Sequence, residues 1–267
     1  MRKFNYQALK FFLLLALTML TKQVYADIYV ANFYGGTVGK YTDSGQAINT
    51  NLITGLSGPF YLASDSSGNI LISLSYSNKV AKYTSDGTLV DPNFISGLNL
   101  PIGLVVDDFG NIYVSNYGGG NVGKYTSSGG VVNSSLITGL SDPAGLAFDS
   151  SGNLYVSNYG GGKVGKYTSS GGVVNASLIT GLSQPDGLTF DSSGVLYVAE
   201  RSSNKIRKYT SDGAVINATF ITGLNGPTHM IFGRIINNTP IPTLSEWAMI
   251  FLASLMAMVA IRRMRRQ

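Results

Sequence analysis

The stretch Gly139–Thr180, GLSDPAGLAFDSSGNLYVSNYGGGKVGKYTSSGGVVNASLIT, decides the fold of this chain. Close copies of it begin at Gly55, Gly97 and Gly181, and its first two residues return at Gly223. Successive copies start 42 residues apart. Self-similarity at a fixed period indicates a repeat protein, in which each unit buries its apolar surface against the next unit.

Four short apolar runs within the stretch predict four β-strands. They cover residues 145–148, 154–157, 163–168 and 173–179, and clusters of Gly, Asn, Asp and Ser separate them. No segment has the 3.6-residue apolar period that a helix needs. A repeat of about 40 to 45 residues with four antiparallel strands is typical of a β-propeller blade.

Two other repeat architectures do not fit. Leucine-rich repeats are too short, at roughly 20 to 29 residues. A WD-type propeller needs Gly-His and Trp-Asp pairs in every copy, whereas this chain has one histidine, His229, and one tryptophan, Trp247.

The two ends of the repeat region predict a further blade. Residues 27–54 correspond to strands two to four of a unit, and residues 223–236 correspond to a first strand. With the complete repeats 55–96, 97–138, 139–180 and 181–222, they predict an all-β propeller of five four-stranded antiparallel blades over residues 27–236. The composite blade would close the ring and remove open sheet edges. Pairing between two chains is the alternative way of closing it.

The repeat resembles the NHL family of propeller blades. The residues that carry the resemblance are Pro143, Gly145–Asp149, Ser151–Asn158 and Lys163–Tyr167. The resemblance implies the propeller fold, but NHL propellers more often have six blades than five. It does not imply a function, because one fold hosts many functions.

Residues 1–26 are predicted to be a secretory signal peptide. Arg2 and Lys3 precede an apolar core over residues 11–20, and small residues stand at the −3 and −1 places before a cut between Ala26 and Asp27. An uncleaved membrane anchor is the alternative. The apolar core is short for one, since a span needs about 20 residues.

The C-terminal end has three parts after a linker over residues 237–240. An apolar run predicts a transmembrane helix over residues 247–261, and an arginine-rich tail follows it. The motif in front of the helix consists of Ile241, Pro242, Thr243, Leu244, Ser245, Glu246 and Trp247.

This tail closely resembles the IPTL-type sorting signal, a relative of the PEP-CTERM signals of Gram-negative bacteria. The resemblance implies transient anchoring in the inner membrane and processing by an exosortase-type enzyme. It also implies delivery to the cell surface or the extracellular matrix. A plain tail anchor is the alternative.

Charge and cysteine content exclude two classes of function. Eight of the nineteen Lys and Arg residues lie in the two terminal signals, which leaves eleven against thirteen acidic residues in the propeller. A near-neutral propeller gives no basis for nucleic-acid binding. The chain has no cysteine, and therefore has neither a thiolate nucleophile nor a cysteine-based metal site.

Four charged residues depart from the repeat on one face. The loops between strands two and three and the connections between blades are predicted to share this face. Asp186, Glu200, Arg201 and His229 fall there in one sector. We expect them to line a small polar binding pocket. The alternative is a surface ion pair between Glu200 and Arg201, with His229 a loose end of the composite blade.

The leading functional prediction is a non-catalytic module that binds a glycan or a protein of the extracellular matrix, without a cofactor or metal. One alternative is a metal-dependent lactonase-like or lyase-like enzyme. In it, Asp186 and Glu200 would supply part of a cation site, although one histidine cannot build a three-histidine zinc site. The other alternative is a structural matrix protein that binds no discrete ligand.

Three recurring polar features are predicted to be structural. The Asp-Ser-Ser-Gly segments at Asp65, Asp149 and Asp191 are read as hairpin turns rather than cation loops. Asn133, Asn175 and Asn217 are read as strand residues. The repeated lysines are expected to pack their stems with the ammonium solvated, anionic polysaccharide sites being the alternative. They are Lys40, Lys82, Lys124, Lys166 and Lys208.

Overall fold

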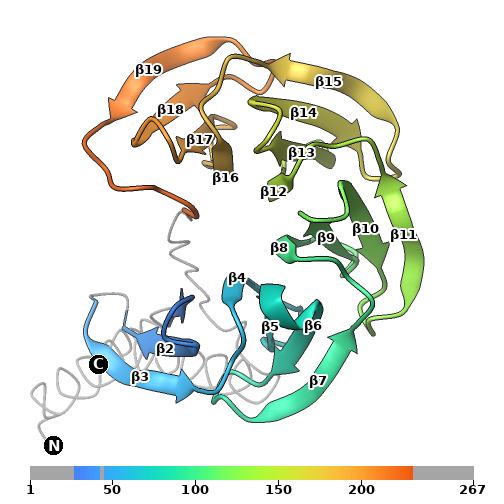
Figure 1. Cartoon of the computed structure of the whole chain (residues 1–267), viewed down its shortest axis with the longest axis vertical. Helices are drawn as coiled ribbons and strands as arrows, with labels where there is room; N and C mark the ends of the chain where they lie inside the picture. The colour runs from blue at the N-terminus through green and yellow to red at the C-terminus, as the bar shows by residue number, and fades with distance from the viewer. Residues whose placement is uncertain (1–26, 43–44, 231–267) are drawn as a thin grey trace, which may run out of the picture. The chain divides into compact units, whose positions relative to one another are not determined.

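Five antiparallel sheets surround a central axis in the computed structural model, so the chain folds as a five-bladed, all-β propeller (Figure 1). The structure describes residues 27–42 and 45–230. The predicted signal peptide, linker, sorting motif and transmembrane helix lie outside the described residues. Within the described ranges, no helix is long and apolar enough to cross a membrane.

The strands follow the predicted repeat. Blade 1 holds β1 (Ile28–Asn32), β2 (Thr37–Tyr41) and β3 (Ala47–Ile53). Blade 2 holds β4 (Pro59–Ser64), β5 (Ile70–Leu74), β6 (Lys79–Tyr83) and β7 (Leu89–Ile95), with the 3-10 helix η1 (Ser75–Ser77) after β5. Blade 3 holds β8 (Pro101–Val106), β9 (Ile112–Asn116), β10 (Asn121–Tyr125) and β11 (Val131–Ile137). Blade 4 holds β12 (Pro143–Phe148), β13 (Asn153–Asn158), β14 (Lys163–Thr168) and β15 (Val173–Ile179). Blade 5 holds β16 (Pro185–Phe190), β17 (Leu196–Glu200), β18 (Lys205–Tyr209) and β19 (Val215–Ile221).

Each complete blade runs from the axis outward in chain order. The first strands β4, β8, β12 and β16 surround the axis, and β7, β11, β15 and β19 form the circumference (Figure 1). The second strands β5, β9 and β17 are buried along their whole length. Neighbouring blades cover both faces of β5 and β9, while β17 lies between blade 4 and residues 223–230. The core therefore lies between the blades, as the repeat pattern predicts.

Blade 1 has three strands among the described residues, since no ladder joins β1 to a first strand. Residues 223–230 contact blade 5 as the start of each following blade contacts the blade before it. The Leu224 amide donates to the Asn204 carbonyl at 3.1 Å, and Met230 packs on the buried cluster of Tyr197, Ala199 and Ile206. Because residues 231–236 lie outside the described residues, the composite blade stays a prediction.

An engineered disulfide tests the composite blade. In blade 2, Leu62 of the first strand pairs with Ile72 of the second, and the residues at the same repeat positions are Met230 and Val30. We expect Val30→Cys with Met230→Cys to form an intramolecular disulfide on oxidation, measured by mass spectrometry. The chain has no other cysteine to compete.

Tyr34→Cys with Met230→Cys is the matched control, and we expect no bond in it. Absence of the bond in the first pair would show that the composite blade is wrong. A disulfide-linked dimer would show closure by two chains instead.

The first strands approach one another closely around the axis. A Cβ atom on Gly145 would lie 2.3 Å from the carbonyl oxygen of Asp186 in the next blade, and Gly103 and Gly187 have equivalent contacts at 2.1 Å. A buried serine joins the same strands. Ser157 Oγ accepts the Gly145 N–H at 2.7 Å and donates to the Asp186 carbonyl at 2.7 Å. At these three contacts the neighbouring backbone leaves no room for a Cβ atom.

We expect Gly145→Ala to lower the free energy of unfolding by about 3 kcal/mol, the upper end for overpacking, because the carbonyl it meets is backbone and cannot rotate away. Urea denaturation measures the effect. Gly161→Ala is the control, since its nearest neighbour is 3.4 Å away, and it should cost under about 1 kcal/mol. Equal costs for the two variants would contradict the close-approach argument.

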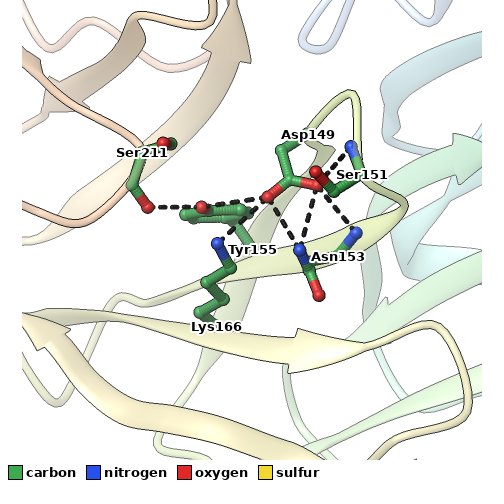
Figure 2. Close-up of polar contacts among 6 residues, drawn as sticks. All are labelled: Asp149, Ser151, Asn153, Tyr155, Lys166 and Ser211. Atoms are coloured by element: carbon green, nitrogen blue, oxygen red, sulfur yellow. Dashed lines mark hydrogen bonds and ion pairs between the residues drawn. The ribbon is translucent and has the colours of Figure 1, made fainter.

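The three Asp-Ser-Ser-Gly segments form hairpin turns, as predicted, and Figure 2 shows the one at Asp149. Asp149 Oδ1 accepts the backbone N–H groups of Ser151 at 3.0 Å and Asn153 at 2.9 Å, while its Oδ2 lies 3.1 Å from Lys166 Nζ. The Tyr155 hydroxyl lies 3.2 Å from Asp149 Oδ2 and 2.6 Å from the Ser211 carbonyl of blade 5. The turn thus also joins one blade to the next.

The recurring lysines differ from the prediction of a solvated ammonium. Lys166 Nζ pairs with Asp149 and lies 5.0 Å from the centre of the Tyr155 ring within its own blade, and Lys82 pairs with Asp65 at 2.7 Å. Although desolvation opposes the effect, the Lys82 ammonium and hydrogen bonds from Asn69 lower the pKa of Asp65 to about 2. Lys82 and Lys166 therefore neutralise the aspartates of their own turns.

The outer strands carry a local irregularity at mid-strand. Asn175 Oδ1 accepts the Ser177 N–H at 3.0 Å, and the pairing of β14 with β15 shifts register between Lys166 and Val164. Asn133 and Asn217 make the same contact, and all three asparagines lie in strands, as predicted. A bulge of this kind bends the unpaired edge of a sheet.

Candidate functional site

Three side chains meet at the throat of the propeller, and we call Tyr61, Asp186 and His229 the throat cluster. The Tyr61 hydroxyl lies 3.5 Å from Asp186 Oδ1, and the Tyr61 and His229 ring centres are 4.2 Å apart. Because β4 and β16 belong to blades that are not neighbours, the Tyr61–Asp186 contact crosses the central axis. Two of the four predicted site residues, Asp186 and His229, are therefore brought together.

Glycine elsewhere in the ring explains why Tyr61 reaches the axis. Tyr61, Gly103, Gly145, Gly187 and His229 occupy the same position of successive repeats. The three glycines leave no side chain at this level, so the Tyr61 ring can extend across the throat, where it is 1% exposed. The sequence showed this substitution, but the prediction of site residues considered charged departures and missed an aromatic one.

Asp186 is a buried carboxylate, and few hydrogen bonds offset the free-energy cost of burying it. Its side chain is 2% exposed, and the hydrogen bond from Tyr61 is long. Desolvation raises the pKa of Asp186 to about 6, against the opposing effects of the Arg201 charge and the Tyr61 hydrogen bond. A weakly satisfied buried carboxylate costs stability, which is more often tolerated at a functional site than elsewhere.

His229 stands beside Tyr61 in the throat cluster and is exposed to solvent. Desolvation lowers its pKa to about 4, so the imidazole is neutral at pH 7. It can therefore accept or donate a hydrogen bond there.

Glu200 does not face the throat cluster. It is fully buried, forms an ion pair with Arg207 of β18, and accepts the Ser183 N–H at 2.8 Å and the Ser203 hydroxyl at 3.1 Å. The expected alternative, a surface ion pair with Arg201, is wrong because Arg207 stands beside Glu200 in the same sheet. Glu200 holds the connection between blades 4 and 5.

Arg201 lies at the rim of the mouth, the face that carries the connections between blades. It is exposed, and its charge acts on Asp186 and on Tyr117. The same repeat position carries Phe33, Ser75, Tyr117 and Tyr159 in the other blades. One cation and several aromatic rings therefore follow one another around the mouth.

Aromatic rings gather beside the throat cluster. Phe33 lies 5.2 Å from Phe60 and 5.3 Å from Tyr76 between ring centres, and Phe60 stacks on Tyr61 at 5.9 Å. Tyr76 is 65% exposed, so its face is open to a ligand. On the other side, Tyr117 and Tyr159 meet edge to face at 5.9 Å. The mouth thus combines aromatic surface with a carboxylate, a histidine and an arginine.

A metal site does not fit these residues. Among residues 27–42 and 45–230, no three His, Cys, Asp or Glu side chains come close enough together to hold a metal ion. Glu200, the second acid of the expected lactonase-like site, is engaged with Arg207 rather than turned toward Asp186. The throat offers one buried carboxylate and one imidazole, which is too few for such a site.

Comparison with known proteins gives two family matches. The model of the virginiamycin B lyase family matches residues 14–235, and that of the IPTL-CTERM motif matches residues 239–266. No curated protein matches the chain. The NHL resemblance stays a prediction.

Many solved structures share the fold at low sequence identity. An inactive histidine-to-alanine variant of virginiamycin B lyase from Staphylococcus aureus, with quinupristin, is 19% identical with a TM-score of 0.58, over 79% of this chain and 75% of that one. A gluconolactonase from Xanthomonas campestris is 18% identical with a TM-score of 0.66, over 77% and 75%. A chain of the nidogen/laminin complex is 21% identical with a TM-score of 0.63, over 73% and 75%. Enzymes and a protein that forms a complex are thus both similar in fold.

Proposed function

The chain belongs to the virginiamycin B lyase family, and from that premise and the geometry of its mouth we propose that it is an exported, surface-sorted propeller that binds a carbohydrate without catalysis. The observation that carries the proposal is the buried Asp186 carboxylate under an aromatic rim. Sugars present hydroxyl donors and an apolar ring face in the same molecule. A carboxylate beside exposed aromatic rings can bind both.

The polar groups of the mouth support a neutral or weakly charged ligand. Asp186 has capacity to accept hydrogen bonds beyond the long one from Tyr61, while Arg201 at the rim can donate. The propeller itself carries nearly balanced charge, so strong attraction of a polyanion is not expected. The neutral imidazole of His229 suits a hydroxyl partner.

Binding to a glycan array, followed by calorimetry with the strongest ligand, tests the proposal on the full chain in detergent. We expect Asp186→Asn to weaken binding at least tenfold, because a buried hydrogen-bonded charge is worth well over 1 kcal/mol. Asp142→Asn removes a charge from the connection between blades 3 and 4 and is the matched control, expected to bind normally. No saturable glycan binding, or equal loss in both variants, would refute a carbohydrate site in the throat.

The sorting signal gives the second half of the proposal. The IPTL-CTERM match suggests an exported, surface-sorted protein that a sorting enzyme processes. We propose transient anchoring in the inner membrane through residues 247–261, cleavage by an exosortase-type enzyme, and release to the surface or matrix. Mass spectrometry of the protein from cells with and without that enzyme would identify the cut, and an unprocessed tail in both would contradict it.

A lyase is the second candidate, and family membership with a histidine in the throat favours it. The relative that carries a histidine-to-alanine change is catalytically inactive and was seen with quinupristin. His229 is the one histidine of this chain and contacts Tyr61 beside Asp186. Chromatography of quinupristin incubated with the chain, with and without divalent cations, decides the point. Turnover that His229→Ala abolishes would replace the binding proposal with an enzymatic one.

A further inference from the structure

A cavity of about 240 Å³ lies between blades 3 and 4 and shares no residue with the throat cluster. The end of β11 forms one wall with Leu136 and Ile137, and the hairpin of β14 and β15 forms another. Asn158 and Lys163 line it where β13 leads into β14. This volume would hold about eight water molecules at about 30 Å³ each, or one small organic molecule.

Asn158 has an amide donor with no acceptor. Its residue is 0% exposed, and its Oδ1 accepts the Ser141 N–H at 3.1 Å, which fixes the orientation of the amide. The Nδ2 atom has no hydrogen-bond partner. A buried donor left unpaired is costly and rare in folded proteins, so a ligand at this cavity has a free group to bind.

The other blades show that the unpaired amide donor is specific to blade 4. The two residues concerned are the last of the second strand and the first of the third. Asn32 Nδ2 donates to Thr37 Oγ1 at 3.0 Å, and Asn116 Nδ2 donates to Asn121 Oδ1 at 2.7 Å. In blade 4 the partner position is Lys163, which has no acceptor.

Blades 2 and 5 carry a lysine at the partner position as well, but without an asparagine before it. Their pairs are Leu74 with Lys79 and Glu200 with Lys205. Leu74 has no side-chain donor, and Glu200 is paired with Arg207. Asparagine followed by lysine is therefore the one combination in the described blades that leaves a donor free.

Leu136 lines the cavity where the preceding repeat carries a larger phenylalanine. Leu136 occupies the repeat position of Phe94, and each packs against the glycine of the following hairpin turn, Gly171 and Gly129 respectively. The phenylalanine ring fills more of the space between blades 2 and 3 than leucine fills between blades 3 and 4. Leu52 and Leu178 stand at the same repeat position, so leucine alone does not distinguish this junction. The combination of leucine with the unpaired asparagine and the lysine does.

We propose that this cavity binds a small organic carboxylate. The Asn158 amide donates to a carboxylate oxygen, and the Lys163 ammonium, which bonds Ser177 Oγ at 3.2 Å, adds positive charge. The apolar body of the ligand packs on Leu136 and Ile137. No acidic side chain lines the cavity, so nothing in it repels an anion.

Benzoate and its neutral analogue benzamide are the probes, titrated into the full chain by calorimetry. We expect benzoate to bind at least tenfold more tightly than benzamide. Leu136→Phe and Lys163→Asn copy the residues of the preceding repeat, and each should weaken benzoate at least tenfold without lowering the melting temperature. The fold tolerates both residues at the equivalent junction.

A gain of function provides the matched control. Phe94→Leu with Asn121→Lys reproduces the blade 4 combination one junction earlier, and it should raise the benzoate stoichiometry from about one to about two. Absent or unsaturable benzoate binding would overturn the proposal. So would affinity unchanged in Lys163→Asn, or a stoichiometry that stays at about one in the double variant. Asp186→Asn should leave benzoate binding unchanged, which separates this cavity from the throat.

Discussion

Arg207→Ala is expected to lower the free energy of unfolding by about 3 to 5 kcal/mol, because it leaves the Glu200 carboxylate buried without a counter-charge. The backbone N–H of Ser183 and the Ser203 hydroxyl would still donate to that carboxylate. Two neutral donors compensate a buried charge only in part. Urea denaturation at pH 7 measures the loss.

The second blade supplies a matched rescue. It carries Leu74 and Ala81 at the positions of Glu200 and Arg207, with a lysine between them in both blades. Glu200→Leu with Arg207→Ala should therefore recover most of the lost stability, since an apolar pair often replaces a buried ion pair at little cost. If the double variant is no more stable than the single one, the ion pair does not explain the burial of Glu200.

Asp186→Asn is expected to stabilise the folded chain by about 3 kcal/mol at pH 7 while weakening ligand binding. The pKa of Asp186 is raised from 3.8 to about 6 by desolvation, and each pKa unit corresponds to about 1.36 kcal/mol. At roughly 2 to 4 °C per kcal/mol, the melting temperature should rise by about 6 to 12 °C. A stabilising change that weakens binding is expected where a residue is kept for function at a cost in stability.

The sign of the effect depends on pH. A folded-state pKa above the unfolded value means that the protonated carboxyl is favoured in the fold. The stability that the protonated Asp186 carboxyl contributes to the fold is therefore fully present below pH 3.8. It is lost as the pH rises through 6. The advantage of the asparagine variant should be large at pH 7 and vanish near pH 3.5. Calorimetry across this range checks it, and a constant difference would contradict a titrating Asp186.

Periodicity made the propeller predictable from the sequence. The four strands predicted within Gly139–Thr180 correspond to β12, β13, β14 and β15, because turn residues mark each end of a short β-branched run. The close approach that requires Gly145 could not be predicted, since it depends on the distance between neighbouring blades. The position of residues 223–230 beside blade 5 was predictable, because the same contact follows the other blades, for example from the Leu182 amide to the Gly162 carbonyl.

The candidate site was predictable only in part. Counting departures from the repeat placed Asp186 and His229 in one sector, and both lie in the throat cluster. Counting departures did not distinguish Asp186 and His229 from Glu200. The partner of Glu200 is Arg207, which departs from the repeat on another strand. Tyr61 was missed because it is aromatic rather than charged. Two charged departures of opposite sign within one blade, such as Glu200 and Arg207, indicate that the two side chains pair with each other.

Exported proteins that accumulate side by side on a cell face a hazard of fibre formation, since unpaired strand edges can join one copy to another. The outer strands of this ring are long and contain apolar residues such as Val131, Val173 and Val215. Their asparagine bulges interrupt each edge at its middle, so a neighbouring molecule finds no straight row of amides and carbonyls to extend. The bulges therefore disfavour edge-to-edge pairing between copies of this ring.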